Sequence, residues 1–395
     1  MIESRLGRRV AITGLGVLAP CGIGVGAFWE GLMHAPEPAV VRRVPRFEPS
    51  MTGLSHQQAR RLDRFAQLAL AAAAEAMADA GLSDGGGDPD RSGVVLGTGI
   101  GGAQTWEDQV HILTDRGERM VSPLTVPMVM PNAAAAAVSM RWGWRGPCET
   151  ITTACASGTH AVAAGARLVA SGRVDRVLVG GSESCQTDTN LAAFTNMRAL
   201  SPTGISRPFD PQRDGFCNAE AAAVLVLEDL AAAQERGAAV YAEVAGAAST
   251  SDAHHITAPA PGGAGAAACM RLAIADAGLA AAEITHVNAH GTSTQLNDAA
   301  EAAAIGAVFG AHRPVVTSIK GVTGHSLGAA GAVEAVALAL TFARGLIPPT
   351  VAVSTVDPEI DLDVALSPRA WVPAPAISNS FAFGGHNGCV VFLPV

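Results

Sequence analysis

Lysine, aromatic residues and charge are all scarce in this chain of 395 residues. Lys and Arg total 26, yet only Lys320 is a lysine, and aromatic side chains make up 4% of the sequence. Charged residues account for 15%, hydrophobic residues for 49%, and the net charge is -9. A chain this acidic is not expected to bind nucleic acid. So little charge leaves much apolar surface to bury, in a large core, an oligomer interface or both.

The rarity of lysine makes Lys320 informative. Arginine supplies every other permanent positive charge in the side chains. A guanidinium and an ammonium differ in shape and in hydrogen-bonding geometry. We therefore expect position 320 to require an ammonium.

Paired cysteines are also missing. The cysteines are scattered, odd in number and without a CxxC pair, which fits neither a disulfide framework nor a zinc site; they are Cys21, Cys148, Cys155, Cys185, Cys217, Cys269 and Cys389. We expect no metal and a reducing, cytoplasmic setting. The N-terminus runs into a strand-like segment without a signal-peptide core. The uncharged stretch 122–140 is broken by prolines, so we expect no membrane span.

Strand-like and helix-like segments alternate along the chain. Strands are expected over 9–18, 92–96, 174–180, 222–228 and 240–245, and helices over 61–80 and 155–170. Such alternation predicts an α/β protein with a mostly parallel sheet covered by helices.

The chain also carries a weak internal repeat. Residues 153–172 and 323–345 each place a short polar segment before a helix of small residues. Each half ends in a hydrophobic strand, over 221–228 and 387–395. We predict two similar halves, 1–240 and 241–395, packed as one unit.

Two common motifs occur without their usual context. GLGVLA at 14–19 fits a dinucleotide-binding fingerprint, but a Gly- and Pro-rich segment follows it instead of a helix. GHSLG at 324–328 fits a hydrolase elbow with Ser326 as nucleophile, and acids and His386 follow in triad order. However, KGVTG separates this motif from the strand at 315–319. Dinucleotide binding and hydrolysis are therefore minor alternatives.

A third set of residues suits acyl transfer. Cys155 lies among small residues at a helix start, where the helix dipole is expected to lower the pKa of its thiol. His290 follows a strand, and Lys320 precedes His325 by five residues. The glycine turn within 379–388 can present backbone N–H groups to an oxyanion. A thiol, two histidines, one lysine and such a turn fit covalent catalysis with carbanion chemistry.

These motifs resemble those of the β-ketoacyl-acyl-carrier-protein synthases, most closely the type II enzymes of bacterial fatty-acid and polyketide systems. The resemblance runs from ITGLGVLAP through TACASG, SRPFDPQRDGF, NAHGTST and KGVTGHSLGAAGAVE to NSFAFGGHNG. It implies the thiolase fold, with two pseudo-symmetric βαβαβ halves in five layers. It also implies a dimer and no cofactor.

The resemblance assigns roles to individual residues. It implies that Cys155 is the nucleophile of a triad with His290 and His325, and that Lys320 pairs with Glu334. The amides of Cys155 and Phe383 would form the oxyanion hole. Further residues would contact the acyl or pantetheine group, namely Thr292, Thr294, Phe194 and Ile100. A basic patch would dock the acidic acyl carrier protein, from Arg60, Arg61, Arg64 and Arg198.

The implied reaction is a decarboxylative Claisen condensation of an acyl-enzyme with malonyl-ACP in fatty-acid elongation. The alternative is a ketosynthase subunit of a type II polyketide or polyene pathway, paired with a cysteine-less chain-length factor. Ala221 and Ala382 replace glycines of the family pattern and favour a specialised role. Intact Cys155, His290 and His325 suit either a homodimer or a heterodimer.

Overall fold

The computed structural model describes residues 7–395 and is organised around one 12-stranded sheet. One end of the sheet has the order β5-β4-β6-β8-β1 and the other the order β9-β16-β15-β10-β11-β13. The bounds of the first set are β5 Cys148–Ile151, β4 Ser92–Gly97, β6 Arg176–Glu183, β8 Ala221–Asp229 and β1 Val10–Ala19. Those of the second are β9 Ala242–Ser251, β16 His386–Leu393, β15 Ala376–Ala382, β10 His286–Asn288, β11 Val315–Thr317 and β13 Asp363–Val364.

The two ends of the sheet have the same topology. In the first half β4 is parallel to β5 and β6, while β8 is antiparallel to both β6 and β1. In the second half β10 is parallel to β11 and β15, while β16 is antiparallel to both β15 and β9. Strands β1 and β9 pair over three residues and join the halves. The boundary between residues 240 and 241 stays a prediction.

The expectation of a mostly parallel sheet is wrong, because the sheet is mixed. Its antiparallel pairs join strands that are distant in the chain, such as β1 with β8 and β9 with β16, as well as strands that follow each other directly. The seven-residue register from β15 to β16 is one such case, closed by the tight turn at 383–385.

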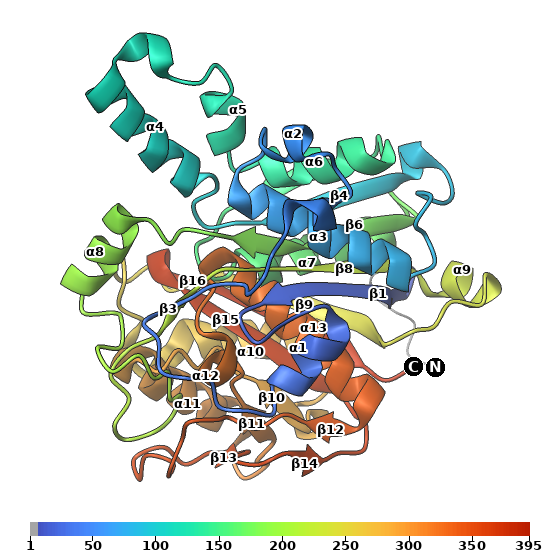
Figure 1. The fold of residues 1–395 in the computed structure, drawn as a ribbon. Helices are drawn as coiled ribbons and strands as arrows, with labels where there is room; N and C mark the ends of the chain where they lie inside the picture. The colour runs from blue at the N-terminus through green and yellow to red at the C-terminus, as the bar shows by residue number, and fades with distance from the viewer. Residues whose placement is uncertain (1–6) are drawn as a thin grey trace.

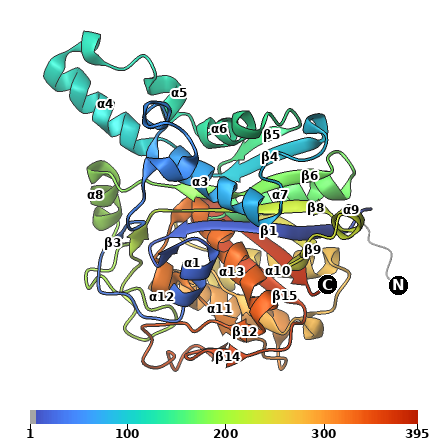
Figure 2. The ribbon, with the colours of Figure 1, turned by 45° about the vertical axis from the view of Figure 1, so that its right-hand side comes forward.

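Helices divide the structure into layers (Figures 1 and 2). Helices α3 (Arg64–Asp79) and α6 (Ala133–Trp142) cover the outer face of the first half. Helices α7 (Ser157–Ala170) and α13 (Ala330–Arg344) pack on each other between the halves. Helices α10 (Ala264–Asp276) and α11 (Gln295–Phe309) cover the second half. This arrangement gives the five alternating layers that were predicted.

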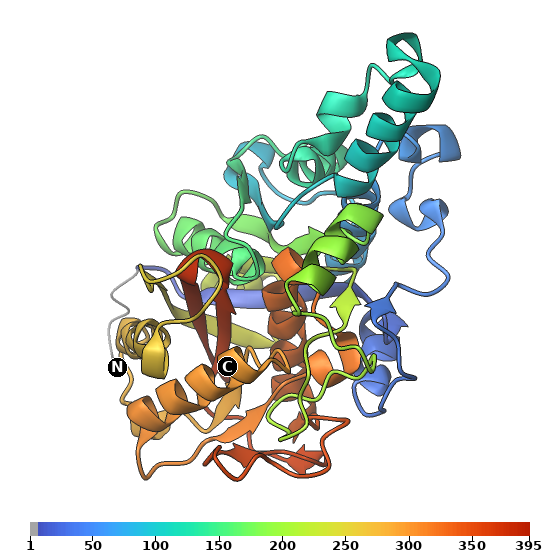
Figure 3. The same ribbon diagram turned by 90° about the vertical axis from the view of Figure 1, so that its left-hand side faces the viewer.

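The remaining helices and strands lie around these layers. Helix α4 and helix α5 extend away from the body as an arm (Figures 1 and 3). The helices are α1 Val25–Gly31, α2 His56–Ala59, α4 Ala103–Arg116, α5 Thr125–Val129, α8 Asp188–Asn196, α9 Leu230–Glu235 and α12 Lys320–Thr323. Short strands are β2 Gly22–Ile23, β3 Val41–Arg42, β7 Asn218–Ala219, β12 Leu346–Ile347 and β14 Arg369–Ala370.

The glycines of the GLGVLA segment allow close packing of β1 on α3. A Cβ on Gly16 would lie 2.0 Å from the carbonyl oxygen of Ala72, and one on Gly14 would lie 2.3 Å from that of Ala76. Any larger residue would push the helix off the strand. The two glycines therefore serve strand–helix packing, and no helix follows them at the position that a dinucleotide site needs.

One segment is apolar and long enough to cross a membrane. It spans Leu327–Arg344, includes α13, and 89% of it is buried inside the fold. Its position between the two halves explains its hydrophobicity, because α13 contacts strands of both and also α7.

Candidate active site

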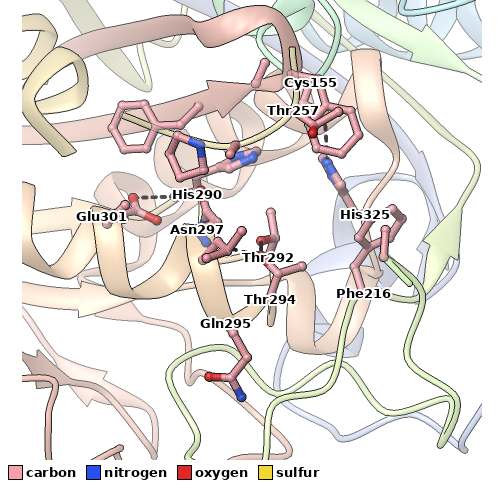
Figure 4. A pocket seen from close by; sticks show the side chains of 18 of the residues that line it. Cys155, Phe216, Thr257, His290, Thr292, Thr294, Gln295, Asn297, Glu301 and His325 are labelled. Carbon is pink, nitrogen blue, oxygen red and sulfur yellow. Dashed lines mark hydrogen bonds between the residues drawn. The ribbon is translucent and has the colours of Figure 1, made fainter. Parts of the chain in front are cut away.

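Cys155 lies two residues before α7 begins and lines a cavity of about 330 Å³ (Figure 4). The preceding residue, Ala154, has a left-handed backbone with φ 50°. That conformation is unfavourable for alanine and is maintained by the surrounding fold. It turns the chain sharply before the helix. The side chain of Cys155 is 6% exposed.

His325 is the direct partner of the thiol. Its Nε2 lies 3.1 Å from Cys155 Sγ, as the dashed line in Figure 4 indicates. Burial raises the pKa of Cys155 to about 12, against smaller opposing effects of Lys320 and the Phe383 amide. The expected lowering of this pKa by the helix is therefore wrong. Since the resting group is a thiol, its proton needs an acceptor, and His325 Nε2 is within reach.

His290 is held by the single lysine. Lys320 Nζ donates to the carbonyl oxygen of His290 at 2.6 Å and to Nδ1 of its ring at 3.2 Å, and it also pairs with Glu334. An ammonium can only donate, so Nδ1 of His290 accepts and the ring proton lies on Nε2. Lys320 and Glu334 are each 1% exposed. Their pairing was predicted from the sequence.

Both histidines are neutral in this site. Burial lowers the pKa of His290 and that of His325 well below the usual value, and the charge of Lys320 adds to both shifts. The two rings meet edge to face, with centroids 5.3 Å apart. Two neutral imidazoles can therefore donate from Nε2 to one substrate oxygen.

The turn after β15 closes the other side of the thiol. Its glycines, Gly384 and Gly385, have φ of 80° and 72°, which a residue with a Cβ would adopt only under strain. The turn directs the Phe383 amide at Cys155, and this hydrogen bond opposes the rise in the pKa of the thiol. A donor in this position can bind an oxyanion formed on the acyl carbon.

Two buried carboxylates that sequence reasoning missed support the histidine segments. Glu301 accepts from the amides of His290 and Gly291 at 2.8 and 2.7 Å. Glu183 accepts from the Gly99, Ile100 and Gly328 amides, at 2.5 Å for the first. Burial raises the pKa of each to about 7. No motif marks them, because their amide partners become neighbours only in the folded chain.

The predicted substrate contacts lie in different places. Thr292 and Thr294 line the cavity, and their hydroxyl oxygens are 2.9 Å apart. Phe194 meets Phe216 edge to face at 5.6 Å, and Phe216 meets the His325 ring at 5.1 Å. Phe216 was not predicted. Ile100 is 41% exposed and is not among the residues that line the cavity, so its predicted substrate contact has no counterpart here.

The four arginines of the predicted basic patch lie in different environments. Arg198 lines the cavity, and Arg60 and Arg61 are exposed at the end of α2. Arg64 donates to both carboxylate oxygens of buried Glu220, at 2.7 and 3.0 Å, and lies over the Phe47 ring. The guanidinium of Arg64 is thus engaged within the chain, and its predicted role in docking a partner stays a prediction.

The residues of the hydrolase alternative do not assemble. The acids that would orient a triad histidine each pair with an arginine: Asp357 with Arg213, Asp361 with Arg313 and Asp363 with Arg369. Ser326 does not belong to the cavity lining, whereas its neighbour His325 faces Cys155. The elbow motif is part of the segment that positions His325.

The chain belongs to the β-ketoacyl synthase family. The family model described as "Beta-ketoacyl synthase, N-terminal domain" matches residues 33–233, and "Beta-ketoacyl synthase, C-terminal domain" matches residues 241–354. The chain is 40% identical to "3-oxoacyl-[acyl-carrier-protein] synthase 2" of Synechocystis sp. over 408 residues, covering 98% of both chains. The protein of the same name from Staphylococcus aureus is 40% identical over 407 residues, again covering 98% of both.

Solved structures confirm the predicted thiolase-type α/β fold. "The ishigamide ketosynthase/chain length factor" superposes with a TM-score of 0.93 at 33% identity, covering 98% of this chain and 100% of that one. A β-ketoacyl synthase from Burkholderia phymatum gives 0.89 at 32% identity with the same coverage. A type II polyketide ketosynthase solved with its acyl-carrier protein gives 0.89 at 30%, again with that coverage. The fold and the relatives define an acyltransferase of the β-ketoacyl-[acyl-carrier-protein] synthase class.

Proposed function

We propose that this chain condenses an acyl group on Cys155 with malonyl-ACP, extending a fatty-acid chain by two carbons. The observation that carries the proposal is the contact between Cys155 Sγ and His325 Nε2 at 3.1 Å, beside a second neutral histidine. The 3-oxoacyl-ACP synthase 2 relatives support the choice of substrate.

The first step loads the enzyme. The thiol of Cys155 gives its proton to His325 Nε2 as sulfur attacks the thioester carbonyl of acyl-ACP. The amide of Phe383 stabilises the oxyanion that forms. The intermediate then expels the pantetheine thiolate, which takes up the proton. Thr292 and Thr294 line the cavity where the pantetheine arm would lie.

The second step makes the nucleophile. Malonyl-ACP replaces the free carrier and loses carbon dioxide, leaving an enolate on the thioester oxygen. Nε2–H groups of His290 and His325 donate to that oxygen, and Lys320 keeps His290 in the required tautomer. The carbanion attacks the acyl carbon on Cys155, and sulfur leaves as thiolate and takes up a proton from solvent. The balanced products are β-ketoacyl-ACP, free ACP and carbon dioxide.

The carrier is proposed to dock beside the cavity mouth. Arg198 lies at the cavity, and Arg60 and Arg61 are free on the surface. Steering of an acidic carrier by these charges weakens with salt. Substituting Arg60 and Arg61, which lie outside the cavity lining, by Glu should raise KM for acyl-ACP about tenfold and leave KM for small thioesters unchanged. Arg173→Glu, on the turn after α7, is the control, and equal effects on both substrates would refute docking.

The enzyme is also proposed to be a dimer working in the cytoplasm, where its seven free cysteines stay reduced. Strand β5 ends the sheet with an unpaired edge, which a second β5 could extend. Exposed apolar side chains follow the arm that projects beyond it: Trp106, Val110, Leu113, Met120 and Val126. A second copy of the chain would cover this surface.

One experiment decides the pathway. The chain purified alone should have the mass of a dimer and convert saturated acyl-ACP and malonyl-ACP into β-ketoacyl-ACP. The likeness to a ketosynthase/chain length factor structure gives the alternative, a heterodimer of a polyketide or polyene pathway. A lone chain that stays inactive until a cysteine-less homologue is added would overturn fatty-acid elongation by a homodimer and establish that alternative.

A further inference from the structure

A buried arginine lies next to the segment that carries His325. Arg42, on β3, is 6% exposed, and within residues 7–395 no carboxylate forms an ion pair with it. Its guanidinium donates to backbone carbonyls instead. Burial lowers the pKa of this guanidinium, yet arginine stays charged in proteins. A buried charge without an acidic partner costs free energy, so Arg42 requires an explanation beyond packing.

The carbonyls belong to α12, the helical turn that precedes His325. Arg42 Nη1 donates to the carbonyl oxygens of Gly321 and Val322, at 3.0 and 2.8 Å. The last carbonyls of a helix have no donor within it, and the helix dipole favours a positive charge beside them. The chain then leaves the helix at Gly324, whose φ is 70°. Arg42 therefore closes the C-terminal end of α12, where the chain turns toward His325.

The same segments are also joined through the backbone. Strand β3 pairs in parallel with β7, so that Arg42 lies beside Ala219. On the other side of β7 the His325 amide donates to the Cys217 carbonyl at 2.8 Å, and the Ala219 amide donates to the His325 carbonyl at 3.0 Å. Figures 1 and 2 show β3 next to α12. The backbone of His325 is thus held directly by β7 and also by α12, whose end Arg42 holds.

The guanidinium also meets the side chain of Cys217. Burial raises the pKa of this thiol, and the charge of Arg42 is the largest effect that opposes the rise. The carbonyl of Cys217 is the acceptor for the His325 amide. Arg42 therefore contacts both backbone segments that determine where His325 lies.

We propose that Arg42 is a positioning residue, which fixes α12 so that His325 Nε2 stays within reach of the Cys155 thiol. The inference rests on the proposed function, because that function needs His325 to take the thiol proton. Nε2 and Sγ are 3.1 Å apart, and a displacement of about 1 Å can slow a reaction about 10²-fold. Arg42 is not among the residues that line the cavity, so it acts through His325 and not on the substrate.

Removing the guanidinium should lower the reactivity of Cys155. In Arg42→Ala the carbonyls at the end of α12 lose their donor, so His325 is no longer fixed. Alkylation of Cys155 by iodoacetamide should slow about tenfold or more, and kcat for condensation should fall likewise, while KM for acyl-ACP is unchanged. Mass spectrometry of the Cys155 peptide over time gives the alkylation rate separately from that of the other cysteines. His325→Ala gives the rate expected without the proton acceptor.

Arg236 is the matched control. Its Nη1 donates to the carbonyl oxygen of Ala80, at the C-terminal end of α3, at 2.9 Å, and neither residue lines the cavity. Arg236→Ala thus removes the same kind of helix-end contact elsewhere in the fold. Both alanine variants should unfold at a lower urea concentration than wild type, but only Arg42→Ala should lose Cys155 reactivity. Equal losses of reactivity would make Arg42 a structural residue and overturn the proposal.

Two further substitutions separate hydrogen bonding from filling of space. Arg42→Met occupies much of the same space without a charge to desolvate, so it should be at least as stable as Arg42→Ala yet remain about tenfold slow in alkylation. Arg42→Lys keeps a charged donor without the planar fork, and its alkylation rate should lie within about threefold of wild type. Equal alkylation rates in the Met and Lys variants would overturn the role of Arg42, even if Arg42→Ala does not fold.

Alkylation needs no acyl carrier protein, so failure of this inference is distinguishable from failure of the proposed function. Wild-type alkylation rates in Arg42→Ala and Arg42→Met would overturn the role of Arg42, whatever the substrate of the enzyme. A wild-type chain that is alkylated at Cys155 but is not loaded by acyl-ACP would instead overturn the proposed function.

Discussion

His290 and His325 face one cavity but are held in different ways. Lys320 donates to Nδ1 of His290, and the Lys320 ammonium is paired with Glu334. Nδ1 of His325 has no donor or acceptor within residues 7–395, and its Nε2 faces the thiol. Two residues of the same type can therefore take different parts in the reaction. His290 has one fixed tautomer and suits donation only, whereas His325 is free to accept a proton from Cys155 and later to donate one.

Replacing each histidine by alanine should have the largest effect on the rates of the two half-reactions. Both His290→Ala and His325→Ala remove a donor to the enolate oxygen and should slow malonyl decarboxylation by about 10²–10⁴-fold. His325→Ala should also slow loading of Cys155, because burial raises the pKa of that thiol to about 12 and its proton acceptor is lost. Single-turnover acylation and carbon dioxide release, measured separately, test this.

The loading step distinguishes the two variants, since only His325 contacts the sulfur. Equal loading rates in His290→Ala and His325→Ala would contradict the division between the two histidines.

Substitutions of Lys320 test whether its hydrogen bond to Nδ1 fixes the tautomer of His290. Lys320→Ala leaves Glu334 buried without its partner and should lower the free energy of unfolding by about 3–5 kcal/mol. It also frees Nδ1 of His290, so decarboxylation should fall more than loading. Lys320→Arg should fail as well, because the larger planar guanidinium does not fit a site that is 1% exposed. Denaturant unfolding and the two half-reaction assays check this, and a fully active arginine variant would make the single lysine incidental.

The buried carboxyl groups of Glu301 and Glu183 should show the same pH dependence in their contribution to stability, although the two histidines differ in function. Burial raises the pKa of Glu301, behind His290, and of Glu183, behind His325, to about 7 from 4.5. Between these pH values the folded chain keeps a proton that the unfolded chain releases. Each carboxyl therefore contributes stability at low pH that is lost as pH rises toward 7.

Glutamine at position 301 or 183 does not ionise, so it removes the loss of stability that the carboxyl causes as pH rises. The stability of Glu301→Gln and of Glu183→Gln relative to wild type should rise by about 2 kcal/mol between pH 5 and pH 7.5. Urea unfolding across this range is the measurement. A pH-independent difference for both variants would show that these carboxyls are ionised in the folded chain.

Much of the site was predictable from sequence because it is carried by local motifs. Cys155, His290, Lys320 and His325 each follow or precede a regular element, and the fold brings these element ends together. The pairing of Lys320 with Glu334 needed the family resemblance.

The features of the site that the sequence did not predict depend on contacts between segments that are distant in the chain. Arg64 looked like a surface charge but pairs with Glu220, 156 residues away, and Ile100 looked like a substrate contact but lies outside the cavity lining. The pKa of Cys155 follows from its burial in the folded protein, which outweighs the opposing effects of Lys320 and the Phe383 amide.

The most direct test of the account is to follow the acyl group. The purified chain is incubated with acyl-ACP, digested and mapped by mass spectrometry, and a second sample then receives malonyl-ACP. We predict an acyl group on Cys155 and on none of the other six cysteines. Malonyl-ACP should discharge it with release of one carbon dioxide and formation of a β-ketoacyl-ACP two carbons longer. An acyl group on Ser326, or an acyl-Cys155 that malonyl-ACP does not discharge, would contradict the account.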